Sequence, residues 1–305
     1  MTTLSHRAWT ASQNTPPIEV SFEFFPPGSQ KAVERLLNTA ESLEPYAPRF
    51  LSVTCGAGGS DDLSSDKSFE AIQTLRRSVD TNLAAHLTCV GRSKREIDQR
   101  VREYAAAGIR RIVALRGDAP DGEAFRPHSG GYANAAELVA GIRQITDLDI
   151  SVAAYPESHP DSPSRAADLF NLKQKLDAGA NRAITQFFFD NQLFVEFVAE
   201  ARAAGIDQPI IPGILLIDDF FKAKKFALKC GTSVPEWLDG RFAGLENDPE
   251  THRLVAVSVA VEQVLDLAAQ GVRKFHFFTL NKSDLAVAVC RSLGLVPAQQ
   301  TLRAA

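Results

Sequence analysis

Arg111-Ile-Val-Ala-Leu115 and Ile210-Ile-Pro-Gly-Ile-Leu-Leu216 are nearly unbroken apolar runs, and they decide the fold class of this chain. A strand with one face in water alternates apolar and polar residues, whereas a parallel strand covered on both faces is apolar throughout. Similar short runs recur along the chain, each followed by a helical pattern. They predict eight strands, at residues 18–25, 49–55, 82–90, 110–116, 149–155, 182–189, 209–216 and 274–280.

The spacing of these runs predicts the connections between them. Successive strands begin roughly 30 residues apart, the length of a strand and its crossover helix. The last interval is about twice as long, so we expect extra helices between the seventh and eighth strands. Ser93 and Glu96 have the spacing of a capping box, and glycines end helical patterns at Gly179, Gly205 and Gly271.

Eight alternating strands and helices predict a single-domain TIM barrel, an α/β fold. The competing fold is a doubly wound sheet with a dinucleotide fingerprint. The segment Gly56-Ala-Gly-Gly59 follows a strand but lacks the third glycine at the required spacing. The barrel is therefore favoured. We expect a flexible tail at residues 1–17, the barrel at residues 18–295 and a short tail at residues 296–305.

Composition excludes several classes of function. The 305 residues are 45% hydrophobic and 23% charged, with a net charge of -4, which favours neither nucleic acid nor a membrane surface as a partner. The polar N-terminal stretch predicts no signal peptide, and the lack of an apolar run of about 18 residues predicts no membrane span. Four scattered cysteines indicate reduced thiols and a cytoplasmic protein, and the histidines lack metal-ligand spacing, so no metal is expected.

Ser21-Phe-Glu-Phe-Phe-Pro-Pro27 places a carboxyl group inside an apolar strand. Alternation puts Phe22 and Phe24 on one face and Ser21 and Glu23 on the other. Burial raises the pKa of a carboxyl group, which suits a general acid near neutral pH. A structural ion pair between Glu23 and a basic neighbour is the open alternative.

Polar residues gather where the predicted strands end, and in a TIM barrel those ends form the active site. They are Glu23, Thr54, His86, Arg116, Asp118, Tyr155, His159, Gln186 and Asn281. Each one alone also fits a structural role; His86 can be a buried core histidine, and Arg116 can pair with Asp118. Buried polar groups need partners, so their clustering at one rim favours a ligand site.

In its motifs, the chain resembles the methylenetetrahydrofolate reductase family, in its bacterial single-domain form. The matching motifs run in order from about residue 18 to 293. They are Ser21-Phe-Glu-Phe-Phe-Pro-Pro27, Ser52-Val-Thr54, His86-Leu-Thr-Cys89, Ala114-Leu-Arg-Gly-Asp118, Ala153-Ala-Tyr-Pro-Glu157, Asn171-Leu-Lys173, Asp177-Ala-Gly-Ala-Asn181, Ile184-Thr-Gln-Phe-Phe-Phe-Asp190, Ile211-Pro-Gly-Ile214, Phe275-His-Phe277 and Thr279-Leu-Asn281.

The resemblance implies a barrel that holds FAD non-covalently. It implies a ping-pong reaction in which NADH or NADPH, with NADH favoured, reduces the flavin. After the nicotinamide leaves, 5,10-methylenetetrahydrofolate binds in its place and is reduced to 5-methyltetrahydrofolate. It further implies a role in one-carbon metabolism and methionine biosynthesis, and a homo-oligomer.

The resemblance also assigns residue roles. Glu23 corresponds to the general acid that opens the folate's five-membered ring, and Asp118 to a catalytic aspartate near flavin and pterin. Gln186 corresponds to the pterin contact, and Phe226 to an aromatic that stacks on nicotinamide and folate in turn. Without the resemblance, Phe226 fits ordinary core packing. The implied flavin contacts are Thr54, Cys55, Ala57, His86, Arg116, Gly117, Asp118, Tyr132, Ala133, Tyr155, His159, Asp168, Asn171 and Lys175. Thr54 and Asp118 are shared with the substrate site, which also includes Lys222 and Lys282.

Three positions depart from the family pattern. Cys55 stands where relatives often carry an aromatic residue, Lys222 where the enterobacterial form has glutamine, and Lys282 where it has arginine. A lysine carries a point charge, whereas the guanidinium of arginine can form two parallel hydrogen bonds. Contacts to the folate tail should therefore differ. The alternatives left open are a flavin-free pterin-binding methyltransferase or Schiff-base lyase on the same barrel, and a binder without activity.

Overall fold

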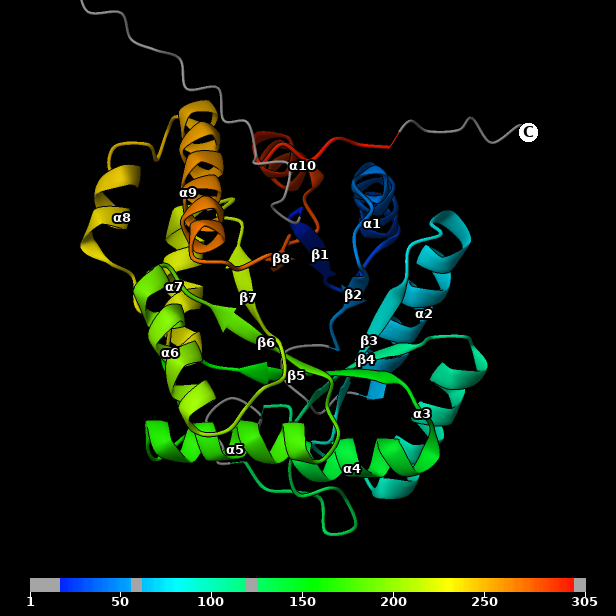
Figure 1. Ribbon diagram of the computed structural model, residues 1–305. Helices are drawn as coiled ribbons and strands as arrows, with labels where there is room; N and C mark the ends of the chain where they lie inside the picture. The colour runs from blue at the N-terminus through cyan, green and yellow to red at the C-terminus, as the bar shows by residue number, and fades with distance from the viewer. Residues whose placement is uncertain (1–16, 56–61, 119–124, 299–305) are drawn as a thin grey trace, which may run out of the picture.

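The protein forms a closed barrel of eight parallel strands in the order β1 to β8, as the sequence predicts. The computed structural model describes residues 17–55, 62–118 and 125–298 (Figure 1). The strands are β1 (Glu19–Phe24), β2 (Leu51–Val53), β3 (Leu83–Thr88), β4 (Arg111–Leu115), β5 (Asp149–Ala154), β6 (Arg182–Phe187), β7 (Ile210–Leu215) and β8 (Lys274–Phe278). Pairing of β1 with β8 closes the barrel, with Ser21 opposite His276.

Helices surround the barrel on the outside (Figure 1). They are α1 (Gln30–Leu43), η1 (Glu44–Tyr46), α2 (Asp62–Ser78), α3 (Lys94–Ala106), α4 (Ala135–Ile145), α5 (Arg165–Asp177), α6 (Asn191–Ala203), α7 (Phe220–Cys230), α8 (Glu236–Phe242), α9 (Pro249–Ala269) and α10 (Ser283–Ser292). Three of these, α7 to α9, lie between β7 and β8, so the expectation of extra helices there is confirmed. None of the helices in the described ranges is long and apolar enough to cross a membrane.

Local sequence signals set the helix ends. At the start of α3, the backbone N–H of Ser93 donates to the Glu96 carboxylate at 2.8 Å, and the Ser93 hydroxyl accepts from the Glu96 N–H. The predicted capping box is therefore present. At the start of α7, the Asp219 carboxylate accepts from the Lys222 N–H at 3.0 Å. A cap of this kind contributes about 1 kcal/mol, and here it fixes where α7 leaves the rim of the barrel.

The two faces of β1 have different surroundings, as alternation predicts. Phe22 and Phe24 are completely buried between the barrel and its helices. Burying such a side chain contributes about 1.5–3 kcal/mol. Ser21 and Glu23 point into the barrel, where Ser21 contacts His276. The apolar face therefore anchors the strand, and the polar face is left for the interior.

Charged side chains close the barrel at the N-terminal ends of the strands. Asp149 of β5 accepts hydrogen bonds from Arg111 of β4 and, at 2.6 and 3.0 Å, from Arg182 of β6. The Arg111 guanidinium also lies over the ring of Phe50, 5.6 Å from its centroid. These ion pairs fill this end with side chains, as expected for the stability face of such a barrel.

A close approach between β6 and β7 depends on Gly213. A Cβ atom at this position would lie 2.2 Å from the Thr185 carbonyl oxygen and 2.5 Å from the Phe278 ring. The register between the strands shifts between Ile184 and Phe187, and the Gly213 N–H donates to the Thr185 hydroxyl at 2.9 Å. The irregularity thus lies beside Gln186, as bulges often lie beside sites.

Candidate active site

A cavity of about 530 Å³ lies at the C-terminal ends of the strands. It brings together most of the residues that the sequence predicts for the site. They are Glu23, Thr54, Cys55, His86, Arg116, Gly117, Asp118, Ala133, Tyr155, His159, Asp168, Asn171, Lys175, Gln186 and Phe226. Because they come from strands, loops and helices that are far apart in the sequence, barrel closure places them together.

Three predicted site residues that the structure describes, Tyr132, Lys222 and Lys282, are not part of this lining. A fourth, Ala57, lies outside the described residues. The Tyr132 hydroxyl donates to Asp98 at 2.7 Å, and its side chain is buried against Gly141. Lys222 pairs with Asp219 at 2.9 Å, and Lys282 pairs with Asp218. Both lysines therefore have acidic partners at the rim.

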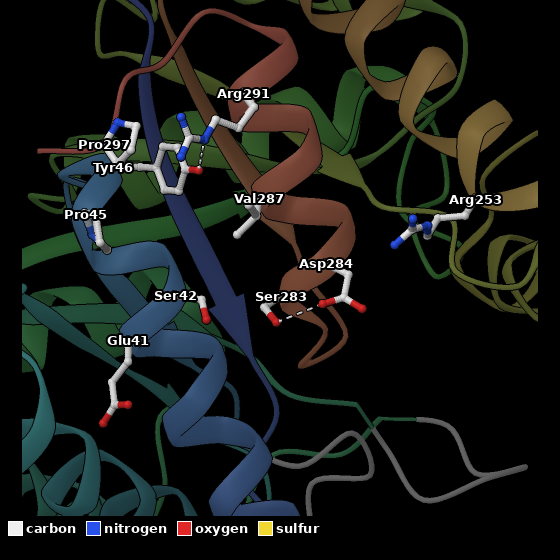
Figure 2. Close-up of a pocket in the computed structure, with 10 residues that line it drawn as sticks. All are labelled: Glu41, Ser42, Pro45, Tyr46, Arg253, Ser283, Asp284, Val287, Arg291 and Pro297. Atoms are coloured by element: carbon white, nitrogen blue, oxygen red, sulfur yellow. Dashed lines mark hydrogen bonds between the residues drawn. The ribbon is translucent and has the colours of Figure 1, made fainter. Parts of the chain in front are cut away.

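A second depression, of about 530 Å³, lies on the outside of the barrel between α1, α9 and α10 (Figure 2). Its charged residues, Glu41, Arg253, Asp284 and Arg291, are exposed to solvent. Figure 2 shows Arg291 turned toward Tyr46, to whose hydroxyl it donates at 2.8 Å. No strand ends in this depression, so the barrel-end cavity is the candidate active site.

Glu23 faces two histidines inside the cavity. Its Oε2 atom lies 3.3 Å from Nε2 of His86 and 3.5 Å from Nε2 of His276. Burial raises the pKa of Glu23, but the charge of His86 and hydrogen bonds from both histidines outweigh this and lower it to about 2. The expectation of a raised pKa is therefore wrong, because it included burial without these two neighbours.

The loop after β8 holds the backbone around Glu23. The Thr279 hydroxyl donates to the Glu23 carbonyl at 2.7 Å. The Asn281 side chain accepts from the Phe25 N–H at 2.8 Å and donates to the Phe25 carbonyl at 2.9 Å. Leu280 and Asn281 both have left-handed backbone angles, with φ of 52° and 56°. Such angles cost about 1–3 kcal/mol each, which neighbouring bonds must offset.

We expect Asn281→Ala to loosen this clamp, by which we mean the two hydrogen bonds between the Asn281 side chain and the Phe25 backbone. Both hydrogen bonds to Phe25 would be lost, and alanine is less tolerant than asparagine of the left-handed angle. The variant should lose about 1–3 kcal/mol of stability and turn over more slowly. Thermal unfolding and steady-state rates measure both effects. Asn38→Ala, on an exposed position of α1, is the control; equal behaviour of the two variants would contradict the role of the clamp.

Cationic groups gather at the side of the cavity formed by β4, β5 and α5. The Lys175 Nζ donates to the Ala153 carbonyl at 2.6 Å, and burial lowers its pKa to about 8. Arg116 pairs with Asp161 at 2.7 Å and lies over the Phe125 ring, 4.4 Å from its centroid. Burial disfavours the charge on Lys175, so an anion bound here would restore it.

Aromatic and amide groups form another part of the cavity wall. Phe226 of α7 stacks on Phe187, with ring centroids 5.4 Å apart and planes inclined by 22°. Phe226 is 41% exposed, so its core-packing interpretation does not hold. The Gln186 Oε1 accepts from the Phe187 N–H at 3.0 Å, which leaves the amide NH₂ available to a ligand. A planar heterocycle with polar edges suits these groups.

The comparisons with known proteins agree with the motifs. The family model for methylenetetrahydrofolate reductase matches residues 10–294. The chain belongs to the methylenetetrahydrofolate reductase family. It is 44% identical over 280 residues to the 5,10-methylenetetrahydrofolate reductases of Pectobacterium carotovorum and Escherichia coli K12. These matches cover 92% of this chain, with 91% of the Pectobacterium protein and 92% of the Escherichia protein.

Solved structures agree on the barrel. An uncharacterized protein from Clostridium thermocellum, which binds two copies of 5-methyl-5,6,7,8-tetrahydrofolic acid, matches with a TM-score of 0.61. The match covers 92% of this chain and 96% of that chain at 12% identity, so it shows the fold alone.

For this member of the family, sequence reasoning missed part of the site. The motif Phe275-His-Phe277 does not by itself predict a role for His276, although its position between Phe275 and Phe277 indicates that it points into the barrel. His276 is fully buried and meets the cavity through its contact with Glu23. Lining residues for which the sequence predicts no role include Phe125, Asp161, Gln174, Phe187, Phe278 and Leu280. Within the described ranges, no group of three or more acidic, histidine or cysteine side chains has the geometry of a metal site.

Proposed function

We propose that this chain reduces 5,10-methylenetetrahydrofolate to 5-methyltetrahydrofolate, using non-covalent FAD and a nicotinamide, with NADH favoured. The supporting observation is the cavity itself. One space holds a largely buried carboxylate, Glu23, an amide, Gln186, and a stacking aromatic, Phe226. These are the groups that the reaction of the family requires: a proton carrier, a pterin contact and a surface for planar rings.

The residues present fit FAD. Arg116, His159 and Lys175 would hold the diphosphate, and Asp168 and Asn171 the adenosine part. The Thr54 hydroxyl oxygen is buried, has no hydrogen-bond partner among the described residues and lines the cavity, as expected of a group that meets a ligand. The Lys175 site also fits an anion, because burial holds its pKa down in the absence of one.

Bound FAD would supply the hydride chemistry, accepting a hydride from the nicotinamide and passing it to the folate. The chain would supply positioning and protons. Gln186 would bind the pterin edge, and Glu23 would deliver a proton to the nitrogen released as the folate ring opens. A negative Asp118 near the flavin would disfavour further negative charge there, which favours hydride release.

A ping-pong order follows from the proposed positions. Phe226 stacks on Phe187 at the cavity wall, so one aromatic face is available to the nicotinamide and the folate in turn. If both substrates use this face, the oxidised nicotinamide has to leave before the folate binds. Parallel lines in a double-reciprocal plot over both substrates would support this order, and intersecting lines would contradict it.

We expect the purified protein to be yellow and to release FAD on heating, and Lys175→Met to bind FAD about 10- to 100-fold more weakly. The substitution removes the charge but keeps most of the chain volume. Flavin fluorescence on titration of the apoprotein measures the affinity. Lys173→Met is the matched control, because Lys173 lies on the same helix and pairs with Asp177 at 2.9 Å. Equal affinities would remove Lys175 from the proposed diphosphate site.

The colour of the purified protein also distinguishes the proposed reductase from the flavin-free alternatives. A Schiff-base lyase needs a desolvated lysine. Lys175 has a lowered pKa, but it lies on α5 and donates to a backbone carbonyl. Colourless protein that borohydride links covalently to a carbonyl substrate would favour the lyase and contradict the reductase.

A further inference from the structure

We propose that His252 is a positioning residue for the aromatic wall of the active site: by accepting a hydrogen bond from the Phe220 N–H, it fixes the helix that carries Phe226. The proposal rests on the proposed function, because Phe226 is the ring on which the nicotinamide and the folate are proposed to stack. It gives a role to α8 and α9, the two helices that the chain adds to its regular alternation of strand and helix.

The first turn of α7 receives a hydrogen-bond acceptor from a distant part of the chain. A helix leaves the N–H groups of its first turn without partners inside the helix. In α7, the Asp219 carboxylate accepts from the Lys222 N–H, and Nε2 of His252 accepts from the Phe220 N–H at 3.1 Å. A backbone N–H can only donate, so Nε2 offers its lone pair in this contact. Because His252 belongs to α9, the bond joins two separate helices.

A row of aromatic side chains holds the His252 ring in place. The ring packs against Phe242 of α8 with centroids 4.7 Å apart, and Phe242 stacks on Phe220 with centroids 4.6 Å apart and planes inclined by 8°. Both phenylalanines are buried. The row joins α7, α8 and α9 at one side of the barrel (Figure 1). It therefore fixes where Nε2 lies relative to the start of α7.

Both ends of α7 are tied to the end of β6. At the C-terminal end of the helix, the Thr232 hydroxyl donates directly to the Phe187 carbonyl at 3.1 Å. At the N-terminal end the connection runs through α9, where the Gln263 side chain donates to the Phe188 carbonyl at 2.8 Å. Gln263 and His252 are about 16 Å apart along the α9 axis. Helix α9 thus connects the end of β6 with the start of α7.

The position of α7 relative to β6 sets the geometry of the aromatic wall. Phe226 comes from α7 and Phe187 from β6, and their rings stack with centroids 5.4 Å apart. Phe226 is 41% exposed, so packing around its own side chain fixes it only in part. Without the bond from His252, the N-terminal end of α7 is free to shift. The Phe226 ring would then tilt away from Phe187, and a planar ligand would lose part of its contact area.

Two substitutions of His252 test the contact with α7 without any substrate. His252→Phe keeps an aromatic ring against Phe242 but removes the acceptor, whereas His252→Gln places an amide oxygen near the position of Nε2. We expect the amide hydrogens of residues 217–226 to exchange about 10- to 100-fold faster in His252→Phe, and close to the wild-type rate in His252→Gln. Hydrogen exchange of the purified protein, followed by mass spectrometry of its peptides, measures this.

A positioning role predicts a loss of substrate binding with little loss of chemistry. In stopped-flow reduction of the holoenzyme by NADH, His252→Phe should raise the apparent dissociation constant of NADH about 5- to 30-fold. The limiting rate at saturation should stay within about twofold of wild type. Reoxidation by 5,10-methylenetetrahydrofolate should show the same pattern. His252→Gln should recover most of the affinity, and both variants should bind FAD as wild type does, because His252 does not line the cavity.

Glu262→Gln is the matched control on the same helix. The Glu262 carboxylate pairs with Arg241 of α8 at 2.7 Å. Its substitution weakens the contact between α8 and α9 but leaves the bond from Phe220 to His252 in place. We therefore expect Glu262→Gln to keep the wild-type exchange of residues 217–226 and the wild-type affinity for both substrates.

The outcomes distinguish this proposal from the proposed function. If the wild-type protein does not reduce the folate at all, the proposed function fails. If it does, and His252→Phe keeps the wild-type affinities, only the positioning role is overturned. Equal losses of affinity in His252→Phe and His252→Gln would also overturn it, because the acceptor atom would then not matter. Should His252→Phe not fold, Phe242→Leu removes the ring that holds His252, and wild-type exchange and affinity in that variant would overturn the proposal.

Discussion

Glu23→Gln should slow reduction of the folate by about 100- to 10,000-fold and leave reduction of the flavin by NADH near the wild-type rate. The amide has nearly the shape of the carboxyl group, so the cavity should keep its form. It cannot pass on a proton, so the folate ring would open without acid assistance. Hydride transfer from the nicotinamide needs no such proton at the folate, which is why the two half-reactions should separate.

Two stopped-flow experiments measure this separation: flavin reduction by NADH, and flavin reoxidation by 5,10-methylenetetrahydrofolate. Glu19→Gln is the matched control, because Glu19 lies at the opposite end of the same strand and pairs with Arg49 at 3.2 Å. It should leave both rates unchanged. Equal losses in both half-reactions of Glu23→Gln would contradict an acid role and indicate a role in binding or folding.

Gly213→Ala should destabilise the barrel by about 2–4 kcal/mol. The new Cβ atom would lie 2.2 Å from the Thr185 carbonyl oxygen, which is backbone and cannot rotate away. The Phe278 ring, 2.5 Å from the same position, would also have to move. Chemical denaturation followed by circular dichroism measures the loss.

The same substitution should impair folate binding, because the displaced segment includes Gln186. We expect a raised KM for the folate even at temperatures where the variant stays folded. Gly240→Ala is the control: Gly240 lies within α8 with open space around it, so alanine there should be neutral or stabilising by up to about 1 kcal/mol. Matching stabilities for the two variants would contradict the close-approach argument.

The strands were predictable because burial on both faces leaves a continuous apolar run. The expected strand at residues 182–189 differs from β6 (Arg182–Phe187) by two residues at one end, for example. Alternation also predicted correctly that Phe22 and Phe24 lie on one face of the strand and Ser21 and Glu23 on the other. These features depend on residues that are close together in the chain.

The state of Glu23 was not predictable in the same way. Its pKa depends on His276, 253 residues away, and on His86, and both contacts exist only once the barrel closes. Burial considered alone predicts a raised pKa for Glu23, which is the wrong direction. Lys282 shows a similar limit, since its acidic partner Asp218 is 64 residues away in the sequence and meets it only in the folded rim.

The seam between β1 and β8 has a consequence for biosynthesis. Glu23 is made long before Thr279, Asn281 and His276, which hold or face this part of β1 across separations of 253 to 256 residues. A nascent chain that stops before β8 therefore has the Glu23 carboxyl group without the residues that surround it in the closed barrel. Activity should appear abruptly when β8 pairs with β1 and β7. Chains that are truncated before β8 should therefore be inactive rather than weakly active.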